Sequence, residues 1–305
     1  MRKRKPVNLT ASVRRRLLNR TRERGEDFNL ILTRYALERL LYRLAQSQYA
    51  DRFVLKGAML FAVWADRVYR PTRDLDLLGY GDSSRQMLTK VFQEICLTDV
   101  EPDGLVFNAS SVRMSEIRED QEYGGYRVQL VAYLANAQIN LQIDIGFGDV
   151  VRPKAEEIDY PTLLDFPAPR VWAYPRETVV AEKLQAMVDL GIVNTRMKDF
   201  YDLWVIASQF SFYGPSLAEA IKATFVRRGT QIPSDVPIAL SEAFLQDPGK
   251  TTQWKAFLRR TGLEEWGADL SQVITKLRAF LIPPMLAALK DEALTQSWVD
   301  GGPWS

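Results

Sequence analysis

The segment of residues 54–81 constrains this chain most, because it puts two carboxylates on a strand that enters an apolar interior. It predicts a short strand, a lysine-glycine turn, a helix, a loop and a second strand that carries Asp74 and Asp76. Residues two apart on a strand point to the same face, so the two carboxylates lie side by side. Two leucines follow them directly, and unpaired charge is costly in apolar surroundings. A divalent metal between the carboxylates is the simplest way to offset their repulsion.

The composition is that of an ordinary globular chain of 305 residues, with 47% hydrophobic and 26% charged residues. That length predicts one large or two modest domains. Cys96 is the single cysteine, so no disulfide forms within one chain, and a reducing cytoplasm fits. No apolar run approaches the ~20 residues that span a bilayer, and no apolar segment follows the basic N-terminus. We therefore expect a cytoplasmic protein without a membrane partner.

Histidine is absent from the chain. This excludes catalysis by a Ser-His-Asp or Cys-His arrangement and any zinc site with histidine ligands. Any chemistry must therefore use carboxylates, lysine, hydroxyls or a hard metal ion.

The net charge of +2 is unevenly spread along the chain. Residues 1–24 contain ten lysines or arginines and one acidic residue, whereas the remaining residues contain 30 basic and 37 acidic side chains. Such an asymmetry indicates a partner that carries phosphates. A solvated basic arm without a partner is the alternative interpretation.

Hydrophobic periodicity and turn residues predict an α+β fold, with a mixed-sheet core and a helical C-terminal half. Helices are expected at 8–24, 28–49, 58–65 and 84–97, and strands at 53–55, 74–79, 111–117, 126–135 and 138–147. A proline-rich connection then runs to residue 169. Further helices are expected at 177–190, 198–209, 215–228, 238–244, 252–261 and 270–289. The predicted domains are basic N-terminal helices at 1–50, an α/β core at 51–170, a helical domain carrying part of the site at 171–296 and a flexible tail at 297–305.

A third carboxylate strengthens the metal hypothesis. The segment 138–147 alternates polar and apolar residues, and Asp144 lies on its polar side, where it can meet Asp74 and Asp76 across the sheet. Magnesium is typically held by a few carboxylates and completed by phosphate oxygens. The turn at Gly57 presents backbone N–H groups to phosphates, helped by the following helix N-terminus.

Two arginines flank the second strand of this segment. Arg70 and Arg73 are placed to neutralise charge on a departing pyrophosphate. The residues therefore predict a site for a metal-bound triphosphate.

The same residues resemble a known sequence motif. The Lys56-Gly57 turn followed by Arg70, Thr72 and the DLD sequence of residues 74–76 resembles the first motif of the DNA polymerase beta-like nucleotidyltransferase superfamily. Within that superfamily the chain resembles the AbiEii/AbiGii toxin family, over roughly residues 50–210. Three further stretches support this: IDIGFGD at 143–149, ETVVAEKL at 177–184 and RMKDFYDLW at 196–204.

The resemblance implies roles for individual residues. Magnesium is expected on Asp74, Asp76 and Asp144, and Asp144 would also take the proton of the attacking hydroxyl. The implied catalytic residues are Asp74, Asp76, Asp144, Lys183 and Asp202. The implied nucleotide-binding residues are Lys56, Gly57, Arg70, Thr72, Lys183, Lys198 and Asp199.

Some positions have two interpretations or depart from the family pattern. Lys183 lies among apolar residues, so it either contacts the triphosphate, oriented by an aspartate, or forms a buried ion pair with Asp199 or Asp202 that joins two helices. The superfamily usually has serine or a second glycine after its motif glycine, whereas this chain has Ala58, which removes a hydroxyl contact. Thr72 either contacts phosphate or orders the loop by turn hydrogen bonds.

The resemblance implies a toxin of a type IV toxin–antitoxin, or abortive-infection, system. Such an enzyme would transfer a nucleoside monophosphate from an NTP to an RNA acceptor, the 3′ end of tRNA, release pyrophosphate and block translation. A cognate antitoxin would act indirectly. The alternatives are a small-molecule or protein acceptor, a catalytically inactive relative that binds RNA, and kinase-like transfer of the γ-phosphate.

Overall fold

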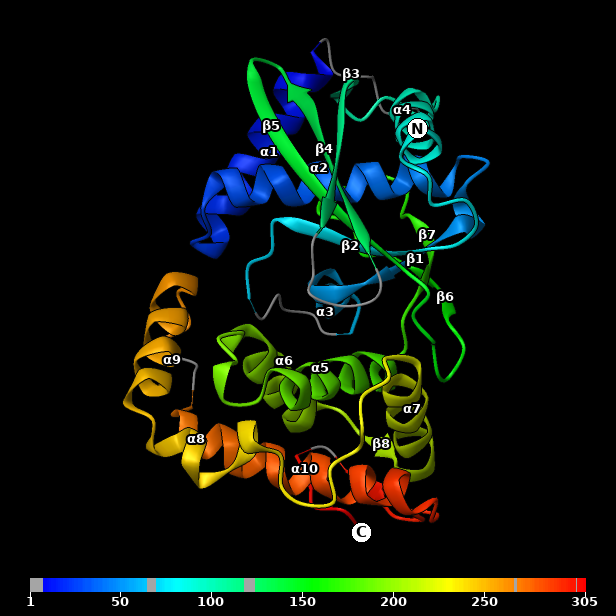
Figure 1. The fold of residues 1–305 in the computed structure, drawn as a ribbon. Helices are drawn as coiled ribbons and strands as arrows, with labels where there is room; N and C mark the ends of the chain where they lie inside the picture. Colours follow the sequence, from blue (N-terminus) through cyan, green and yellow to red (C-terminus); the bar gives the residue numbers. More distant parts are fainter. Residues whose placement is uncertain (1–7, 65–69, 118–123, 266–267, 300) are drawn as a thin grey trace. The chain divides into compact units, whose positions relative to one another are not determined.

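A computed structural model describes residues 8–64, 70–117, 124–265, 268–299 and 301–305 of the chain (Figure 1). The chain divides into two compact units. Unit 1 comprises Met1–Gly148 and Glu156–Ala173, and unit 2 comprises Asp149–Ala155 and Tyr174–Ser305. The basic helix expected near the N-terminus therefore belongs to the same unit as the predicted sheet.

Unit 1 is built on a seven-stranded mixed sheet with the strand order β3-β4-β5-β2-β1-β7-β6. In this sheet β2 lies between β1, to which it is antiparallel, and β5, to which it is parallel. The sheet and the helical C-terminal half confirm the predicted α+β class. The strands are β1 (Phe53–Lys56), β2 (Asp74–Gly79), β3 (Leu105–Ile117), β4 (Gly125–Leu134), β5 (Ala137–Phe147), β6 (Glu156–Asp159) and β7 (Arg170–Ala173).

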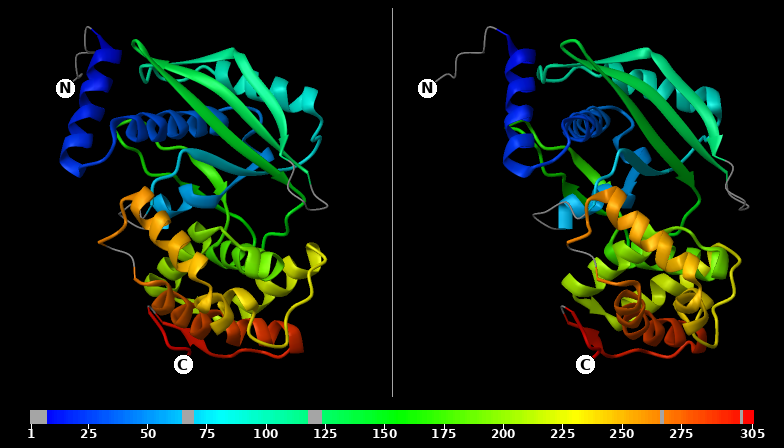
Figure 2. Two further views of the ribbon diagram at one scale, coloured as in Figure 1. Left: turned by 60° about the vertical axis from the view of Figure 1, so that its left-hand side comes forward. Right: turned by 90° about the vertical axis from the view of Figure 1, so that its left-hand side faces the viewer.

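Side chains alternate along β2, so Leu75 and Leu77 face the core and the carboxylates face the other side of the sheet. Leu75 and Leu77 are each 1% exposed, whereas Asp74 and Asp76 point to the opposite face and are half-buried. Helices α2 (Phe28–Ala45) and α4 (Arg85–Leu97) pack on the sheet, with α2 lying across β5 and β7 (Figure 2). The apolar face of the sheet is thereby buried, and the carboxylates stand on the other face.

Helix α2 also carries buried charges that hold two connecting segments. Arg39 and Arg43 donate to the Asp103 carboxylate, with Arg43 Nη1 2.6 Å from Asp103 Oδ2. Glu38 is 1% exposed and accepts a hydrogen bond of 2.7 Å from the Leu163 backbone N–H. Burial raises the pKa of Glu38 to about 7. These pairs fix the segments before β3 and before β7 against α2.

The basic helix α1 (Leu9–Arg24) begins and ends with recognisable caps. The Asn8 side chain accepts from the Ala11 N–H, and Gly25 ends the helix in the left-handed conformation with φ +65°. Val13 and Leu17 are fully buried, which places α1 against the rest of unit 1.

In its described residues, unit 2 is built of helices and a two-stranded ribbon of β8 (Phe212–Tyr213) and β9 (Ser297–Trp298). Short 3-10 turns occur at Gly191–Val193 and Ile238–Leu240. The helices are α5 (Arg176–Leu190), α6 (Met197–Gln209), α7 (Gly214–Arg227), α8 (Glu242–Gln246), α9 (Pro248–Thr261) and α10 (Leu270–Lys290).

Helix α10 is the one helix among the described residues that is long and apolar enough to cross a membrane. Core helices of globular proteins pass the same test of length and composition. In unit 2, α10 packs against α6 and α7 and begins with a capping box of Asp269 and Gln272. Its residues Ile274, Leu277 and Phe280 are fully buried.

The structure differs from the expectation of a flexible tail at 297–305. Trp298 is 1% exposed, and its Nε1 donates to the Ala207 carbonyl at 2.8 Å. Trp304 Nε1 donates to the Phe280 carbonyl at 3.1 Å. Two tryptophans supply enough apolar area to order a segment whose glycines and proline suggested fraying.

Several element boundaries also differ from expectation. Strand β6 lies within the region expected to be a proline-rich connection, and β7 follows that region directly, where no strand was expected. Strand β3 starts six residues earlier than expected, and its pairing with β4 is irregular between Asn108 and Arg113. The helix expected at 58–65 is a 3-10 turn, Gly57–Leu60, followed by the short helix α3 (Phe61–Trp64), and residue 65 lies outside the described residues.

Candidate active site

Four charged residues form a row across the sheet of unit 1. Lys56 on β1 is directly opposite Asp76 on β2, Asp76 is opposite Asp144 on β5, and Asp144 is opposite Arg127 on β4. Directly opposed residues on neighbouring strands share a face, and Asp74 joins that face two residues before Asp76. The structure thus brings the three predicted carboxylates to one face, with a cation at each end. We call these four residues the charged row.

Arg127 is the member of the charged row that the sequence interpretation missed. Its Nε donates to Asp144 Oδ1 at 2.8 Å and its Nη2 donates to Asp144 Oδ2 at 2.7 Å, so both carboxylate oxygens are engaged. The hydrogen bonds to Asp144 raise the pKa of Arg127, and the charges of Asp74 and Asp76 raise it further. The guanidinium therefore lies in the field of all three carboxylates.

Gly57 is required at its position for two reasons. Its φ is +73°, which favours glycine, and a Cβ added there would lie 1.9 Å from Asp76 Oδ2. The turn backbone therefore packs directly against the carboxylate of the charged row. The described helical segment after it is too short to add a substantial helix dipole, so the turn N–H groups are its contribution to the site.

The carboxylates are ligands of the type that magnesium prefers, but the structure does not assemble the predicted set of Asp74, Asp76 and Asp144 as a metal site. Among the described residues, no group of three or more acidic, histidine or cysteine side chains is placed to hold a metal ion. Asp144 is bound through both oxygens by Arg127, which leaves Asp74 and Asp76 as the candidate pair. One or two carboxylates, completed by substrate phosphates, are the usual protein contribution to a magnesium site.

The loop before β2 contains the remaining predicted contacts of unit 1. The Thr72 hydroxyl lies 3.3 Å from the Asp74 carbonyl and 3.4 Å from the Asp74 backbone N. Thr72 thus makes the turn hydrogen bonds that order the start of β2. Arg70 is half-buried and Arg73 is exposed. Contacts of Lys56, Arg70 and Thr72 with phosphate stay predictions.

In unit 2, Lys183 on α5 joins two aspartates of α6. Its Nζ donates to Asp199 Oδ1 at 2.7 Å and to Asp202 Oδ2 at 2.8 Å, and both aspartate side chains are 1% exposed. Arg196 Nε lies 2.7 Å from the other oxygen of Asp199. Burial alone would raise the pKa of Asp199, but the Lys183 and Arg196 charges lower it to about 2.

The structure therefore contains the ion pair between Lys183 and the two aspartates that joins α5 to α6, which is one of the two interpretations of Lys183. A nucleotide contact of Lys183, Asp199 or Asp202 stays a prediction, as does one of the exposed Lys198.

A second polar cluster in unit 2 contains Asp149 and Glu182, which belong to the stretches that resemble the family signature. Arg228 Nη2 donates to Asp149 Oδ1 at 3.3 Å and lies 3.6 Å from Glu182 Oε2, while Nη1 donates to Gln185 Oε1 at 2.7 Å. The Tyr174 hydroxyl is 3.3 Å from Asp149 Oδ2. Burial alone would lower the pKa of Arg228, but Glu182 and Asp149 raise it. This cluster fixes the start of unit 2 against α5.

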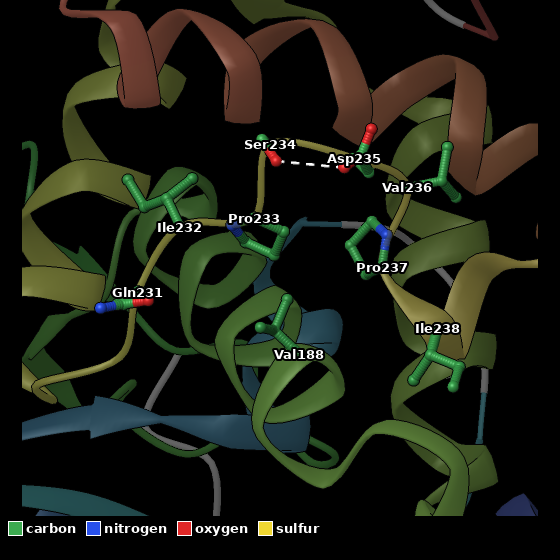
Figure 3. Close-up of a pocket in the computed structure, with 9 residues that line it drawn as sticks. All are labelled: Val188, Gln231, Ile232, Pro233, Ser234, Asp235, Val236, Pro237 and Ile238. Atoms are coloured by element: carbon green, nitrogen blue, oxygen red, sulfur yellow. Dashed lines mark hydrogen bonds between the residues drawn. The ribbon is translucent and has the colours of Figure 1, made fainter.

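Unit 2 also contains a pocket, which Figure 3 shows. Its only ionisable lining residue is Asp235, whose Oδ2 is 3.1 Å from Ser234 Oγ. None of the site residues predicted from the sequence lines it, so it is not the candidate active site. The lining residues are Val188, Gln231, Ile232, Pro233, Ser234, Asp235, Val236, Pro237 and Ile238.

A mixed sheet with a carboxylate pair beside a glycine turn is what is expected of a nucleotidyltransferase. The family model described as "Nucleotidyl transferase AbiEii toxin, Type IV TA system" matches residues 39–275. The chain therefore belongs to the AbiEii family of nucleotidyltransferase toxins from type IV toxin–antitoxin systems.

Two solved structures from Helicobacter pylori are similar to the chain. JHP933 has a TM-score of 0.48 and 16% sequence identity, and the match covers 84% of this chain and 91% of JHP933. A protein provisionally described as a nucleotidyltransferase has a TM-score of 0.47 and 16% identity, with 84% and 94% of the two chains covered. No curated protein matches the chain.

Proposed function

We propose that this chain is a magnesium-dependent toxin that transfers a nucleoside monophosphate from an NTP to RNA, at the 3′ end of tRNA. Transfer would release pyrophosphate and block translation. The observation that carries the proposal is the charged row, in which Asp76 and Asp144 oppose each other beside the Gly57 turn. Family membership adds the toxin role.

In this proposal, Asp74 and Asp76 hold Mg²⁺, which supplies charge neutralisation to the triphosphate and to the leaving pyrophosphate. The acceptor hydroxyl oxygen forms a bond to the α-phosphorus, and the bond from that phosphorus to the bridging oxygen of pyrophosphate breaks. Asp144 accepts the hydroxyl proton. Lys56 and the Gly57 turn bind phosphate oxygens.

Further residues of the proposed site come from the family pattern. Arg70 would neutralise charge on the leaving group, and Thr72 would order the loop that carries Arg70. Lys183 would contact the triphosphate, with Asp202 orienting it. These roles rest on the match of the signature stretches and on the residue types.

The charge distribution of α1 supports an RNA acceptor. Arg14, Arg15 and Arg22 are exposed, and no ion pair engages them within the described part of the chain. At 100° per residue Arg15 and Arg22 lie opposite the buried Val13 and Leu17, and Arg14 lies on the flank between the two sides. A row of unpaired arginines can track a phosphate backbone electrostatically. We place the protein in the cytoplasm, with an antitoxin that acts indirectly.

The proposal is tested by incubating the protein with total tRNA and each α-³²P-labelled NTP, with and without Mg²⁺. We expect label on tRNA with one or more NTPs, only when Mg²⁺ is present, and none from γ-labelled NTP. The variant Asp74→Asn/Asp76→Asn should lose transfer. Asp99→Asn/Glu101→Gln is the matched control, because it removes two exposed acidic residues of the same unit that are also two apart. Full transfer by the first variant would refute the site.

Two alternatives have distinct outcomes in the same assay. A small-molecule or protein acceptor predicts label in the metabolite or protein fraction and none on RNA. A catalytically inactive RNA-binding relative is favoured by Ala58 and by the hold of Arg127 on Asp144. It predicts RNA binding that is independent of Mg²⁺ and of Asp74 and Asp76.

A further inference from the structure

We propose that Arg127 is the resident counter-cation of the charged row and competes with the divalent cation for Asp144. Its bidentate ion pair engages both oxygens of Asp144, so metal binding with Asp144 as a ligand requires this ion pair to break. The inference rests on the proposed function of the same site and concerns a residue that the sequence motifs do not include.

Arg127 and Asp144 form a bidentate ion pair. A guanidinium presents two parallel N–H donors that match the two oxygens of one carboxylate, and Arg127 uses this arrangement at 2.8 and 2.7 Å. Both residues are fixed by the backbone pairing of β4 with β5. A carboxylate whose two oxygens accept from one guanidinium has fewer lone pairs to offer a metal ion. The two cations therefore compete for the same ligand.

This face of the sheet carries three carboxylates close together. Asp76 and Asp144 are directly opposed on neighbouring strands, at a spacing of about 5 Å between Cβ atoms, and Asp74 stands beside them. Like charges at that distance repel in the absence of a cation. Arg127 lies at the Asp144 end of the row and supplies positive charge there, as Lys56 does at the Asp76 end, and the three carboxylates in turn favour the charged form of Arg127.

The exposure of the pair distinguishes this role from that of a structural brace. The side chains of Arg127 and Asp144 are 39% and 21% exposed, so water and a small cation can reach them. Ion pairs with this exposure add little to folding stability. A structural brace would lower stability on removal and leave metal affinity unchanged.

The test measures Mn²⁺ alone binding to the full chain, by the electron paramagnetic resonance signal of the free ion. Arg127→Gln should lower the Kd for Mn²⁺ by about tenfold, which corresponds to ~1.4 kcal/mol. Arg127→Lys keeps a positive charge but loses the paired donors, so a smaller gain of about threefold is expected. Arg113→Gln is the control, because Arg113 is exposed on β3 of the same sheet and donates to the Ser110 and Val112 carbonyls rather than to a carboxylate. Its Kd should equal that of the wild type.

An unchanged Kd in Arg127→Gln, with native circular dichroism, would overturn the inference. If that variant fails to fold, Arg127→Lys decides in its place, and a wild-type Kd there has the same meaning. Adding Asp74→Asn/Asp76→Asn to each background separates this inference from the proposed function. If the variants that lack Asp74 and Asp76 lose Mn²⁺ binding but Arg127→Gln alone does not tighten it, only the role of Arg127 is refuted. If the variants that lack Asp74 and Asp76 still bind Mn²⁺ as tightly, or if neither the wild type nor any variant binds it, the metal site is refuted as well.

Discussion

Gly57 and Asp76 pack so closely that a Cβ on Gly57 would lie 1.9 Å from Asp76 Oδ2 and 2.6 Å from Asp76 Cγ. The turn that is predicted to bind phosphates therefore packs directly against a carboxylate that is predicted to bind the metal ion. Any side chain at position 57 would therefore have to displace Asp76, and it would also have to adopt a positive φ that favours glycine.

Replacing Gly57 with alanine should consequently destabilise the protein by about 2–4 kcal/mol and abolish label transfer, since both the backbone strain and the clash with Asp76 act together. Gly25→Ala is the matched control. Gly25 has φ +65° but nothing within 4 Å of an added Cβ, so it carries the strain without the clash and should cost only ~1 kcal/mol. Urea unfolding measures both. Equal costs at the two glycines would show that the contact with Asp76 is dispensable.

A second prediction concerns Lys183. Lys183→Met leaves the carboxylates of Asp199 and Asp202, each 1% exposed, without their shared ammonium, and should destabilise by about 3–5 kcal/mol. Adding Asp199→Asn and Asp202→Asn removes both buried negative charges and should restore part of that stability.

The same set of variants separates the two interpretations of Lys183. If it contacts the triphosphate, the triple variant stays inactive in label transfer even where urea unfolding shows recovered stability. Recovery of transfer together with stability would show that the ion pair is structural only.

Much of the site geometry was predictable from strand periodicity. The alternation in residues 138–147 placed Asp144 on the polar face, and β5 does pair with β2 so that Asp144 opposes Asp76. Long amphipathic helices such as α2, and the helical character of the C-terminal half, were also predictable, because an apolar stripe over several turns is a strong signal.

Other features depended on contacts that a local pattern does not contain. Strands β6 and β7 have four residues each, too few for a periodic signal, and they are strands because they pair with each other and with β1. The order of the tail depends on where Trp298 packs, which sequence composition does not indicate.

The pairing of Arg127 with Asp144 could have been predicted in part from the sequence. A two-residue turn at Ala135–Asn136 joins β4 and β5 and fixes their register, and that register pairs Arg127 with Asp144. Locating this turn in the sequence would have placed an arginine opposite the third carboxylate.

A third prediction follows from Glu38, whose pKa burial raises to about 7 from an ordinary value near 4.5. The folded state binds this proton more tightly than the unfolded state, so Glu38 favours folding at low pH. Its contribution falls as pH rises from about 4.5 to 7. Relative to Glu38→Gln, the wild type should lose about 2–3 kcal/mol of unfolding free energy between pH 4.5 and pH 8.

Denaturant unfolding of both proteins across that pH range measures the difference, in which other titrating groups cancel. Glu116→Gln, an exposed position on β3, is the control and should parallel the wild type. Parallel curves for wild type and Glu38→Gln would contradict a raised pKa for Glu38.

The last prediction tests whether α1 contacts RNA. Arg14→Gln/Arg15→Gln/Arg22→Gln removes three exposed charges that no acidic side chain engages within the described residues. If each neutralises one phosphate, the slope of log K against log salt for tRNA binding should shrink by about 2–3. The KM for tRNA should rise and kcat should stay unchanged, because none of the three belongs to the charged row.

The matched control is Lys255→Gln/Arg259→Gln/Arg260→Gln, which removes three exposed basic residues from one helix, α9, at the same change in net charge. A general loss of positive charge would weaken tRNA binding equally in both triple variants. A specific contact weakens it only in the α1 variant, because phosphates must be close to the arginines to release their counterions. Equal salt slopes in wild type and the α1 variant would show that this helix is a solvated basic arm and that RNA binds elsewhere.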